Sequence, residues 1–366
     1  MTPFWLRRPF LIARDLLASR DRPDLSALSR IDDPERFVWA VLPHAARTFS
    51  ACIALLPARS ALPAAVAYLY CRMLDTYEDL VPDRLGREAS LRAFAARFEV
   101  TAASLAPVPA IGEASDLDDR DRAHLLLVRR AALVDQVFLG FDDATRRVVR
   151  DLVVAMADGM CWSSEQFANG GVLLDEAGLT RYCRNVLGNP VVFSVRLMRL
   201  EHGASPHVAP HELEDAMRVG EMVQLANITR DVEKDLRRGI AYDASLRADL
   251  GRDALNGDGA LAERCRAVRE RLLRMALQRA PSYGRIIDAL QLPRFSVARA
   301  SAVLMLLFTE RYFRGCARRV GLVAWEGPNS VTALLRRTMA TTFSARRARR
   351  EIARVEAAFL EAARQN

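Results

Sequence analysis

The stretch QLANITRDVEKD, residues 224–235, decides the fold class because it sets amide and charged side chains into a segment that is otherwise apolar. The surrounding segment, 211–238, repeats apolar residues at intervals of three and four, which predicts an α-helix. One face of this helix, about 80° wide, carries four polar side chains: Gln224, Asn227, Asp231 and Asp235. A polar stripe on an apolar helix faces either water or a cavity.

A second acidic stretch, DTYED at residues 75–79, ends another apolar segment, 63–80, that has the same periodicity. A helix over this segment would again gather its polar side chains, here within about 60° of one another. The face consists of Tyr68, Arg72, Asp75 and Asp79. Each of the two segments therefore presents two carboxylates four residues apart.

Paired carboxylates on apolar helices indicate a shared cation, because unpaired charges are expensive to bury. Mg²⁺ prefers oxygen ligands and is usually held by one or two carboxylates together with substrate phosphates. We therefore expect a Mg²⁺ site that binds a diphosphate, with Mn²⁺ as a substitute ion, and with Arg47 and Arg72 gripping the diphosphate oxygens. The alternative is that both acidic sets are solvated helix faces that form ion pairs with neighbouring arginines.

Helical periodicity extends along most of the chain, and alternating strand-like runs with tight hairpin signals are missing, so an all-α fold is predicted. The loop at 101–119 is not expected to divide the chain into domains, because the two acidic stretches lie on either side of it. The predicted helices are 35–56, 63–80, 87–98, 121–139, 143–169, 176–200, 211–238, 260–279, 283–290, 296–320 and 330–364. The predicted organisation is an N-terminal extension (1–34), one catalytic domain (35–320) and a C-terminal segment (321–366).

The composition argues against several classes of protein. The net charge of +8 comes from arginines spread along the chain, with Lys234 the single lysine among 53 basic residues, so no nucleic-acid partner is expected. Six scattered cysteines fit a reducing compartment. No secretory signal or membrane-spanning run is expected, and the predicted location is the cytoplasm or the inner face of the membrane. Motifs for serine hydrolases, P-loop proteins, dinucleotide binding and zinc are absent or unconvincing.

The segment 330–364 combines arginines with apolar residues at helical spacing, which predicts a basic amphipathic helix. Such a helix either packs on the domain with a solvated basic face or contacts an anionic membrane peripherally.

Several short motifs follow one another along the chain in an order that resembles a known family. They are ARTF (46–49), IALLP (53–57), YLYCRML (68–74), DTYED (75–79), MADGM (156–160), Tyr182-Cys183 followed by Gly188, and QLANITRD (224–231) continuing through Asp235 to Arg238-Gly239. Together they resemble the squalene/phytoene synthase family of trans-isoprenyl diphosphate synthases, from about Ala46 to Arg319.

The resemblance implies a single-domain isoprenoid-synthase-type helical bundle around a central cavity. It implies a transferase that condenses two prenyl diphosphates, farnesyl or geranylgeranyl, head to head through a presqualene-type cyclopropyl intermediate to squalene or phytoene. Asp75, Asp79, Asp231 and Asp235 would be catalytic metal ligands. Tyr182 would lie by the reacting carbons and assist proton removal, with released diphosphate as the alternative base. The substrate-binding residues would be Arg47, Tyr68, Arg72, Gln224 and Asn227.

The sequence departs from the family pattern at three places, and for this reason the resemblance does not define the exact product. Ala46 replaces a serine, and the run at 241–244 replaces an R-x-[YF]-x-P motif. Asn189-Pro190 follows Gly188, and a proline there is expected to bend the tyrosine helix.

Three functions therefore stay open at the level of sequence. The leading one is head-to-head condensation, with NADPH as reductant if the product is squalene. The second is a class I terpene cyclase that ionises a single prenyl diphosphate with the same aspartates. The third is a helical membrane adaptor whose acids are solvated.

Overall fold

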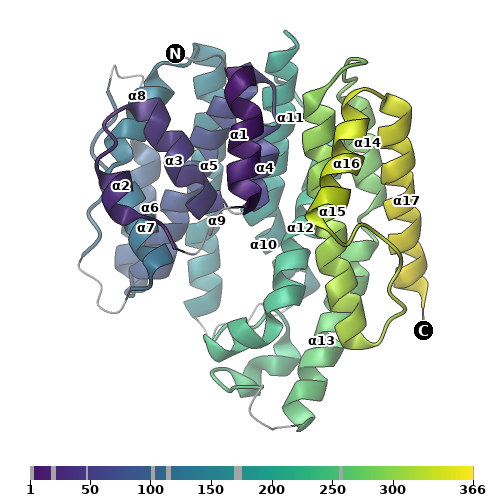
Figure 1. Cartoon of the computed structure of the whole chain (residues 1–366). Helices are drawn as coiled ribbons and strands as arrows, with labels where there is room; N and C mark the ends of the chain where they lie inside the picture. Colours follow the sequence, from purple (N-terminus) through teal and green to yellow (C-terminus); the bar gives the residue numbers. More distant parts are fainter. Residues whose placement is uncertain are drawn as a thin grey trace. The chain divides into compact units, whose positions relative to one another are not determined.

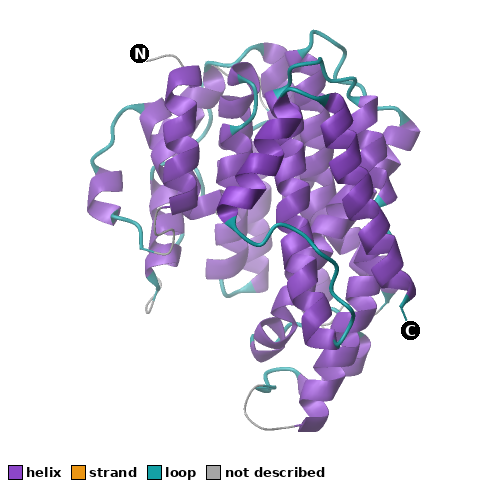
Figure 2. Ribbon diagram, turned by 45° about the vertical axis from the view of Figure 1, so that its right-hand side comes forward, coloured by secondary structure: helices purple, strands orange, loops and turns teal. Residues whose placement is uncertain are grey.

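The computed structural model describes residues 4–17, 22–46, 48–99, 104–112, 117–168, 175–254 and 259–365, and the regular elements of this part are all helices (Figures 1 and 2). The all-α prediction is confirmed. No helix in these ranges is long and apolar enough to cross a membrane. All six cysteines are free thiols.

The chain divides into two compact units. The first comprises residues 1–161 and 196–207, and the second comprises 162–195 and 208–366. Two helices, α9 (Asp143–Ala168) and α11 (Asn189–Glu201), have residues in both units.

The first unit is built on α5, whose apolar sides are covered by its neighbours in the unit. α5 packs against α3, α6 and α7, and its buried residues include Leu69, Tyr70 and Met73. The helices of this unit are α1 (Phe4–Leu17), α2 (Leu25–Ser29), α3 (Pro34–Ala46), α4 (Thr48–Ala54), α5 (Ala58–Leu80), α6 (Arg84–Ala96), α7 (Asp119–Arg129) and α8 (Ala131–Leu139), with the larger part of α9.

The second unit is built on α12, which packs against the π-helical turn η1 and against α13, α14 and α15. Its central stretch from Val219 to Ala226 is entirely buried. The elements are α10 (Glu176–Cys183), η1 (Arg184–Gly188), α12 (Pro210–Arg237), the 3₁₀ turn η2 (Ala244–Asp249), α13 (Gly259–Leu277), α14 (Pro281–Ala289), α15 (Val297–Val320), α16 (Val331–Thr342) and α17 (Ala345–Arg364).

The predicted helices agree with these elements to within a few residues, with four predicted segments interrupted. Segment 35–56 is α3 and α4, 121–139 divides at Arg130, 176–200 contains the π-helical turn, and 330–364 divides at Phe343 and Ser344. In the last case Ser344 caps a new helix, since its side chain accepts a hydrogen bond from the Arg347 amide. The single C-terminal helix was therefore a wrong prediction.

The segment predicted as an N-terminal extension contains α1 and α2. α1 packs against α4, and its arginines bind the rest of the first unit. Arg7 pairs with Glu35 at 2.9 Å, and Arg8 donates to the Leu56 carbonyl at 2.8 Å.

Candidate active site

The first acidic face lies along α5. This helix follows Pro57 and ends at Val81, whose amide donates to the Tyr77 carbonyl, before Pro82 prevents continuation. Between residues 63 and 79, the side chains that are not buried are Tyr68, Cys71, Arg72, Asp75, Glu78 and Asp79. The predicted stripe is therefore the open face of an otherwise buried helix.

Arg72 organises this face. Its guanidinium pairs with Asp75 at 3.0 Å and its Nη2 donates to the Tyr68 hydroxyl at 3.4 Å. The Phe49 ring lies 5.8 Å from the Tyr68 ring, so two aromatic rings adjoin the Arg72 guanidinium on this face. The structure thus brings three predicted site residues, Tyr68, Arg72 and Asp75, into contact.

The pKa of Asp75 is raised to about 6, chiefly by burial; the charge of Asp79 adds to the shift, while Arg72 and Arg120 oppose it. A carboxyl with a raised pKa is one whose negative charge is incompletely neutralised by the protein. A divalent cation would supply the missing charge, so the residues present fit a metal ligand at this position.

Arg120 and His124, both on α7, adjoin this face and were not predicted. α7 packs against α5, and the charges of Arg72 and Arg120 both act on buried His124. Burial, followed by these two charges, lowers the pKa of His124 to about 3, so the imidazole is neutral. The α5 face therefore has two guanidinium groups nearby, of which the sequence indicated only Arg72.

The second acidic face lies along α12. The helix starts at Pro210, where the Glu212 carboxylate accepts the Ala209 amide at 2.9 Å, and it ends before Gly239, which has a φ of 80°. Asn227 donates to the buried Gln224 side chain at 3.2 Å. One turn further on, Arg230 pairs with Asp231 through two bonds of 3.0 and 2.5 Å.

Asp235 has the same electrostatic character as Asp75. Burial and then the charge of Asp231 raise its pKa to about 6, against the opposing charges of Arg238, Lys234 and Arg230. Each acidic face thus has one carboxyl whose pKa is raised and one acidic neighbour four residues away.

The third acid of the second stretch, Glu233, has a structural role. Arg269, which is buried on α13, bonds the Glu233 carboxylate and donates from its Nε to the Thr229 carbonyl at 2.7 Å. Burial by itself would raise the pKa of Glu233, but the hydrogen bond and the charge of Arg269 together lower it, which agrees with a charged and paired carboxylate. Glu233 therefore links α12 to α13, and Asp231 and Asp235 stay the predicted metal ligands of this face.

Tyr182, the predicted catalytic tyrosine, belongs to an aromatic cluster formed with Phe167 and Tyr242. The three rings lie 5.4 to 6.0 Å apart, and the hydroxyls of Tyr182 and Tyr242 are 3.4 Å from each other. Tyr242 comes from the run at 241–244, where the sequence departs from the family pattern. The cluster offers π-faces and two phenols in one place.

The π-helical turn Arg184–Gly188 comes two residues after Tyr182, and α11 starts directly after it at Asn189 with Pro190. The helix therefore changes from α-helical to π-helical geometry directly before Asn189-Pro190, and the predicted bend at the proline stays a prediction. Arg184, its first residue, pairs with Glu221 at 2.7 Å, and Glu221 also holds Arg279 at 2.8 Å. This buried acid of α12 thus links the tyrosine segment to the turn between α13 and α14.

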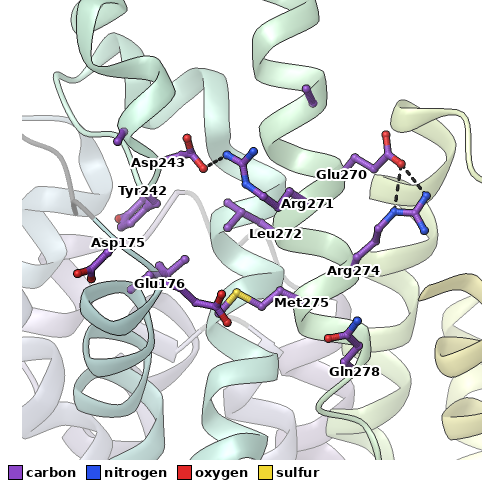
Figure 3. Close-up of a pocket in the computed structure, with 13 residues that line it drawn as sticks. Asp175, Glu176, Tyr242, Asp243, Glu270, Arg271, Leu272, Arg274, Met275 and Gln278 are labelled. Carbon is purple, nitrogen blue, oxygen red and sulfur yellow. Dashed lines mark hydrogen bonds and ion pairs between the residues drawn. The ribbon is translucent and has the colours of Figure 1, made fainter. Parts of the chain in front are cut away.

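A cavity of about 580 Å³ opens beside this cluster, between α10, Tyr242–Ala244 and α13 (Figure 3). Its walls carry acidic and basic side chains that are paired with one another, Asp243 with Arg271 and Glu270 with Arg274. None of the four predicted aspartates lines it. It is therefore separate from the acidic face of α12.

The remaining predicted residue, Arg47, lies outside the described residues. Within the described ranges, no group of three or more histidine, cysteine or acidic side chains is close enough to hold a metal by itself. Each acidic pair could instead provide two carboxylates, with phosphate oxygens and water completing the coordination of a hard cation. Whether the two pairs meet at one site stays a prediction.

Comparison with known proteins gives a family, two relatives and a fold. A sequence profile of the family described as Squalene/phytoene synthase matches residues 42–320. Lycopaoctaene synthase of Botryococcus braunii is 28% identical over 209 residues, covering 56% of this chain and 43% of that protein. A probable squalene synthase of Neurospora crassa is 26% identical over 222 residues, covering 57% and 41%. The aligned part is thus less than half the length of either relative.

Solved structures match nearly the whole chain. TcSQS in complex with the ligand BPH1237 superposes with a TM-score of 0.65 at 17% identity, covering 91% of this chain and 99% of that one. Its complex with E5700 gives 0.62 at 18%, with the same coverage. At this identity the likeness concerns the fold, and it agrees with the predicted helical synthase fold.

Proposed function

This chain belongs to the squalene/phytoene synthase family, and from that premise we propose that it is a Mg²⁺-dependent transferase that joins two prenyl diphosphates head to head. The observation that carries the proposal is the pair of open acidic faces on α5 and α12, each with a carboxyl whose pKa is raised to about 6. Both relatives are named as synthases. Mn²⁺ is the proposed substitute ion.

In the proposed reaction, Asp75 and Asp79 on α5 and Asp231 and Asp235 on α12 would hold Mg²⁺, and the ion would supply positive charge to the leaving diphosphate as the allylic C–O bond breaks. Arg72 binds diphosphate oxygens and keeps its contacts to Asp75 and Tyr68. Gln224 and Asn227, already bonded to each other, orient the substrate on the second face.

The carbocation that forms is attacked by the double bond of the second prenyl diphosphate, and loss of a proton closes a cyclopropylcarbinyl diphosphate. The Tyr182, Tyr242 and Phe167 rings present π-faces that stabilise a cation. Tyr182 assists the proton transfer, and the Tyr242 hydroxyl beside it accepts or donates the hydrogen bond that this transfer requires. Loss of the second diphosphate gives a cation that rearranges, and this cation becomes phytoene by losing a proton or squalene by accepting a hydride from NADPH.

The prenyl diphosphate substrates and the hydrocarbon product favour a location at the membrane surface. We propose that the protein is cytoplasmic and contacts the inner face of the membrane peripherally.

The test is incubation of purified protein with Mg²⁺ and farnesyl or geranylgeranyl diphosphate, with and without NADPH, followed by mass spectrometry of the products. Condensation predicts twice the carbon count of the substrate. A product with the carbon count of one substrate would reject condensation in favour of cyclisation, and no Mg²⁺-dependent turnover or diphosphate binding would reject both enzyme functions.

A further inference from the structure

Three large apolar side chains are exposed together at one end of α16. Phe295 is 58% exposed and Phe343 is 65% exposed, and their rings pack against each other with centroids 5.4 Å apart. Met339 lies one helical turn before Phe343 and is 44% exposed. We call these three residues the aromatic tip.

The tip is held in place by the backbone beside it. The Ser296 amide donates to the Thr342 carbonyl at 3.0 Å, and these residues are the chain neighbours of Phe295 and Phe343. Arg299 is buried beneath them and donates to the carbonyls of Leu292, Pro293 and Arg294 at 2.6 to 3.1 Å. These hydrogen bonds hold together the two backbone segments that carry the exposed phenylalanines.

Core packing does not account for the apolar residues on the outside of α16. Its buried side consists of Leu334 and three threonines, Thr338, Thr341 and Thr342, while Met339 and the adjoining Phe343 are exposed. Polar residues usually cover the outer face of a surface helix, so these two exposed apolar side chains depart from that arrangement. Grouped exposed apolar side chains of this kind mark contact surfaces.

Five exposed arginines come from the same segments as the tip. Among the described residues none of them has an acidic partner, although Arg349 pairs with Asp288 and Arg337 with Glu351. They are Arg294, Arg336, Arg346, Arg347 and Arg350. Asp288 and Glu351 are thus neutralised by other arginines, and these five arginines give the segments that carry the tip a positive charge.

The long apolar face of α17 is buried against other helices of the second unit. Ile352, Val355 and Phe359 are buried, and α17 packs against α13 and α15; Figure 1 shows α16 and α17 in yellow beside α15. The predicted amphipathic helix therefore cannot lay its apolar side on a bilayer. Any membrane contact in this part of the chain has to use other residues.

We propose that the aromatic tip and its five arginines form a docking surface for an anionic lipid bilayer. Weak insertion of a few apolar side chains and attraction of arginines to acidic headgroups are each insufficient, and together they give reversible peripheral binding. The biological purpose rests on the proposed function, because the hydrocarbon product must enter a bilayer. The binding itself does not depend on catalysis.

The experiment measures flotation of the purified full chain with vesicles of phosphatidylcholine, alone or with phosphatidylglycerol. The wild type is expected to float only with the anionic vesicles, and less as salt increases. F295S/F343S is expected to weaken binding about tenfold or more, and R346Q/R347Q is expected to weaken it on anionic vesicles.

Two controls are matched to these variants. F10S removes a phenylalanine that is 72% exposed on α1, and R92Q/R129Q removes two exposed arginines; both are expected to bind like the wild type. If F295S/F343S does not fold by circular dichroism, F343S and R346Q/R347Q decide the question.

The proposal is overturned if the wild type does not float, if it floats equally on neutral vesicles, or if the tip variants bind like the controls. Turnover of prenyl diphosphate in detergent solution is measured in parallel, and the tip variants are expected to retain it. Vesicle binding without turnover would reject the proposed function alone, and turnover without vesicle binding would reject the docking surface alone.

Discussion

Gly220 of α12 crosses Gly188 at the end of the π-helical turn so closely that a Cβ on Gly220 would lie 2.3 Å from the Gly188 nitrogen and 2.4 Å from its Cα. Neither backbone can move away without shifting a helix. The crossing sets the distance between the Tyr182 segment and α12 one turn before Gln224. Two glycines thus determine how the predicted tyrosine approaches the polar face of α12.

We expect G220A to lower the free energy of unfolding by roughly 1–3 kcal/mol, because overpacking forces backbone shifts. Turnover should fall as well, since Tyr182 moves with its segment. The control is G315A in α15, where a Cβ meets nothing within 4 Å; alanine there should stabilise the helix slightly. Denaturant unfolding of both variants checks this, and equal stabilities would contradict the close crossing.

Glu221 joins Arg184 and Arg279 while being almost completely buried. E221Q should lower the free energy of unfolding by roughly 1–3 kcal/mol, because two buried or half-buried guanidinium groups lose their counter-charge. E263Q removes a solvent-exposed partner of Arg266 and should have no measurable effect. If Tyr182 is positioned through this network, kcat should decrease in E221Q more than KM changes.

Asp75 and Asp235 predict an unusual pH dependence for the metal-free protein. Their folded-state pKa of about 6 lies above the unfolded value of 3.8. The folded state therefore binds more protons than the unfolded state in this range, and the contribution of these groups to stability rises as the pH falls through 6.

D75N should remove half of this effect and raise the Tm of the metal-free protein at about pH 7.5. Thermal unfolding with and without Mg²⁺ at several pH values checks it. Mg²⁺ should raise the Tm of the wild type above pH 6, less so at lower pH, because protons compete for the carboxylates. A Tm difference between the wild type and D75N that is independent of pH would contradict the raised pKa.

Arg120 should bind diphosphate together with Arg72, because both charges act on the Asp75 face. We expect R120Q to weaken binding of Mg²⁺-diphosphate about tenfold, the loss of one charge-assisted hydrogen bond. R122Q is the control, since Arg122 is exposed and pairs with Asp119. Calorimetry measures both variants.

R120Q should also raise the pKa of His124 from about 3 without restoring its ordinary value, because burial is the larger cause of the shift. Nuclear magnetic resonance titration of the imidazole measures this. An unchanged pKa of His124 in R120Q would contradict the proximity of Arg120 to this imidazole, while calorimetry decides whether Arg120 binds diphosphate.

Local pattern was sufficient for the helices and for the polar faces. Apolar periodicity predicted both helices and the polar stripes that the structure leaves open, although α5 begins at Ala58, directly after Pro57, and not at the predicted residue 63. Serine is a common N-cap, so Ser344 was a signal for a new helix, but the break was missed because the apolar pattern continues across it.

What local pattern could not supply are the contacts made across long sequence separations. Arg120 reaches the Asp75 face because α7 packs on α5, and Glu233 is occupied because Arg269 arrives from α13. For the same reason, the sequence could not predict what the apolar face of α17 packs against, since an amphipathic helix can pack on a protein or on a bilayer. The sequence by itself determined which residues share a helix face, because that depends on backbone geometry alone. Only the tertiary structure decided which charges are paired and which apolar residues stay exposed, because pairing and burial depend on neighbours brought by the fold.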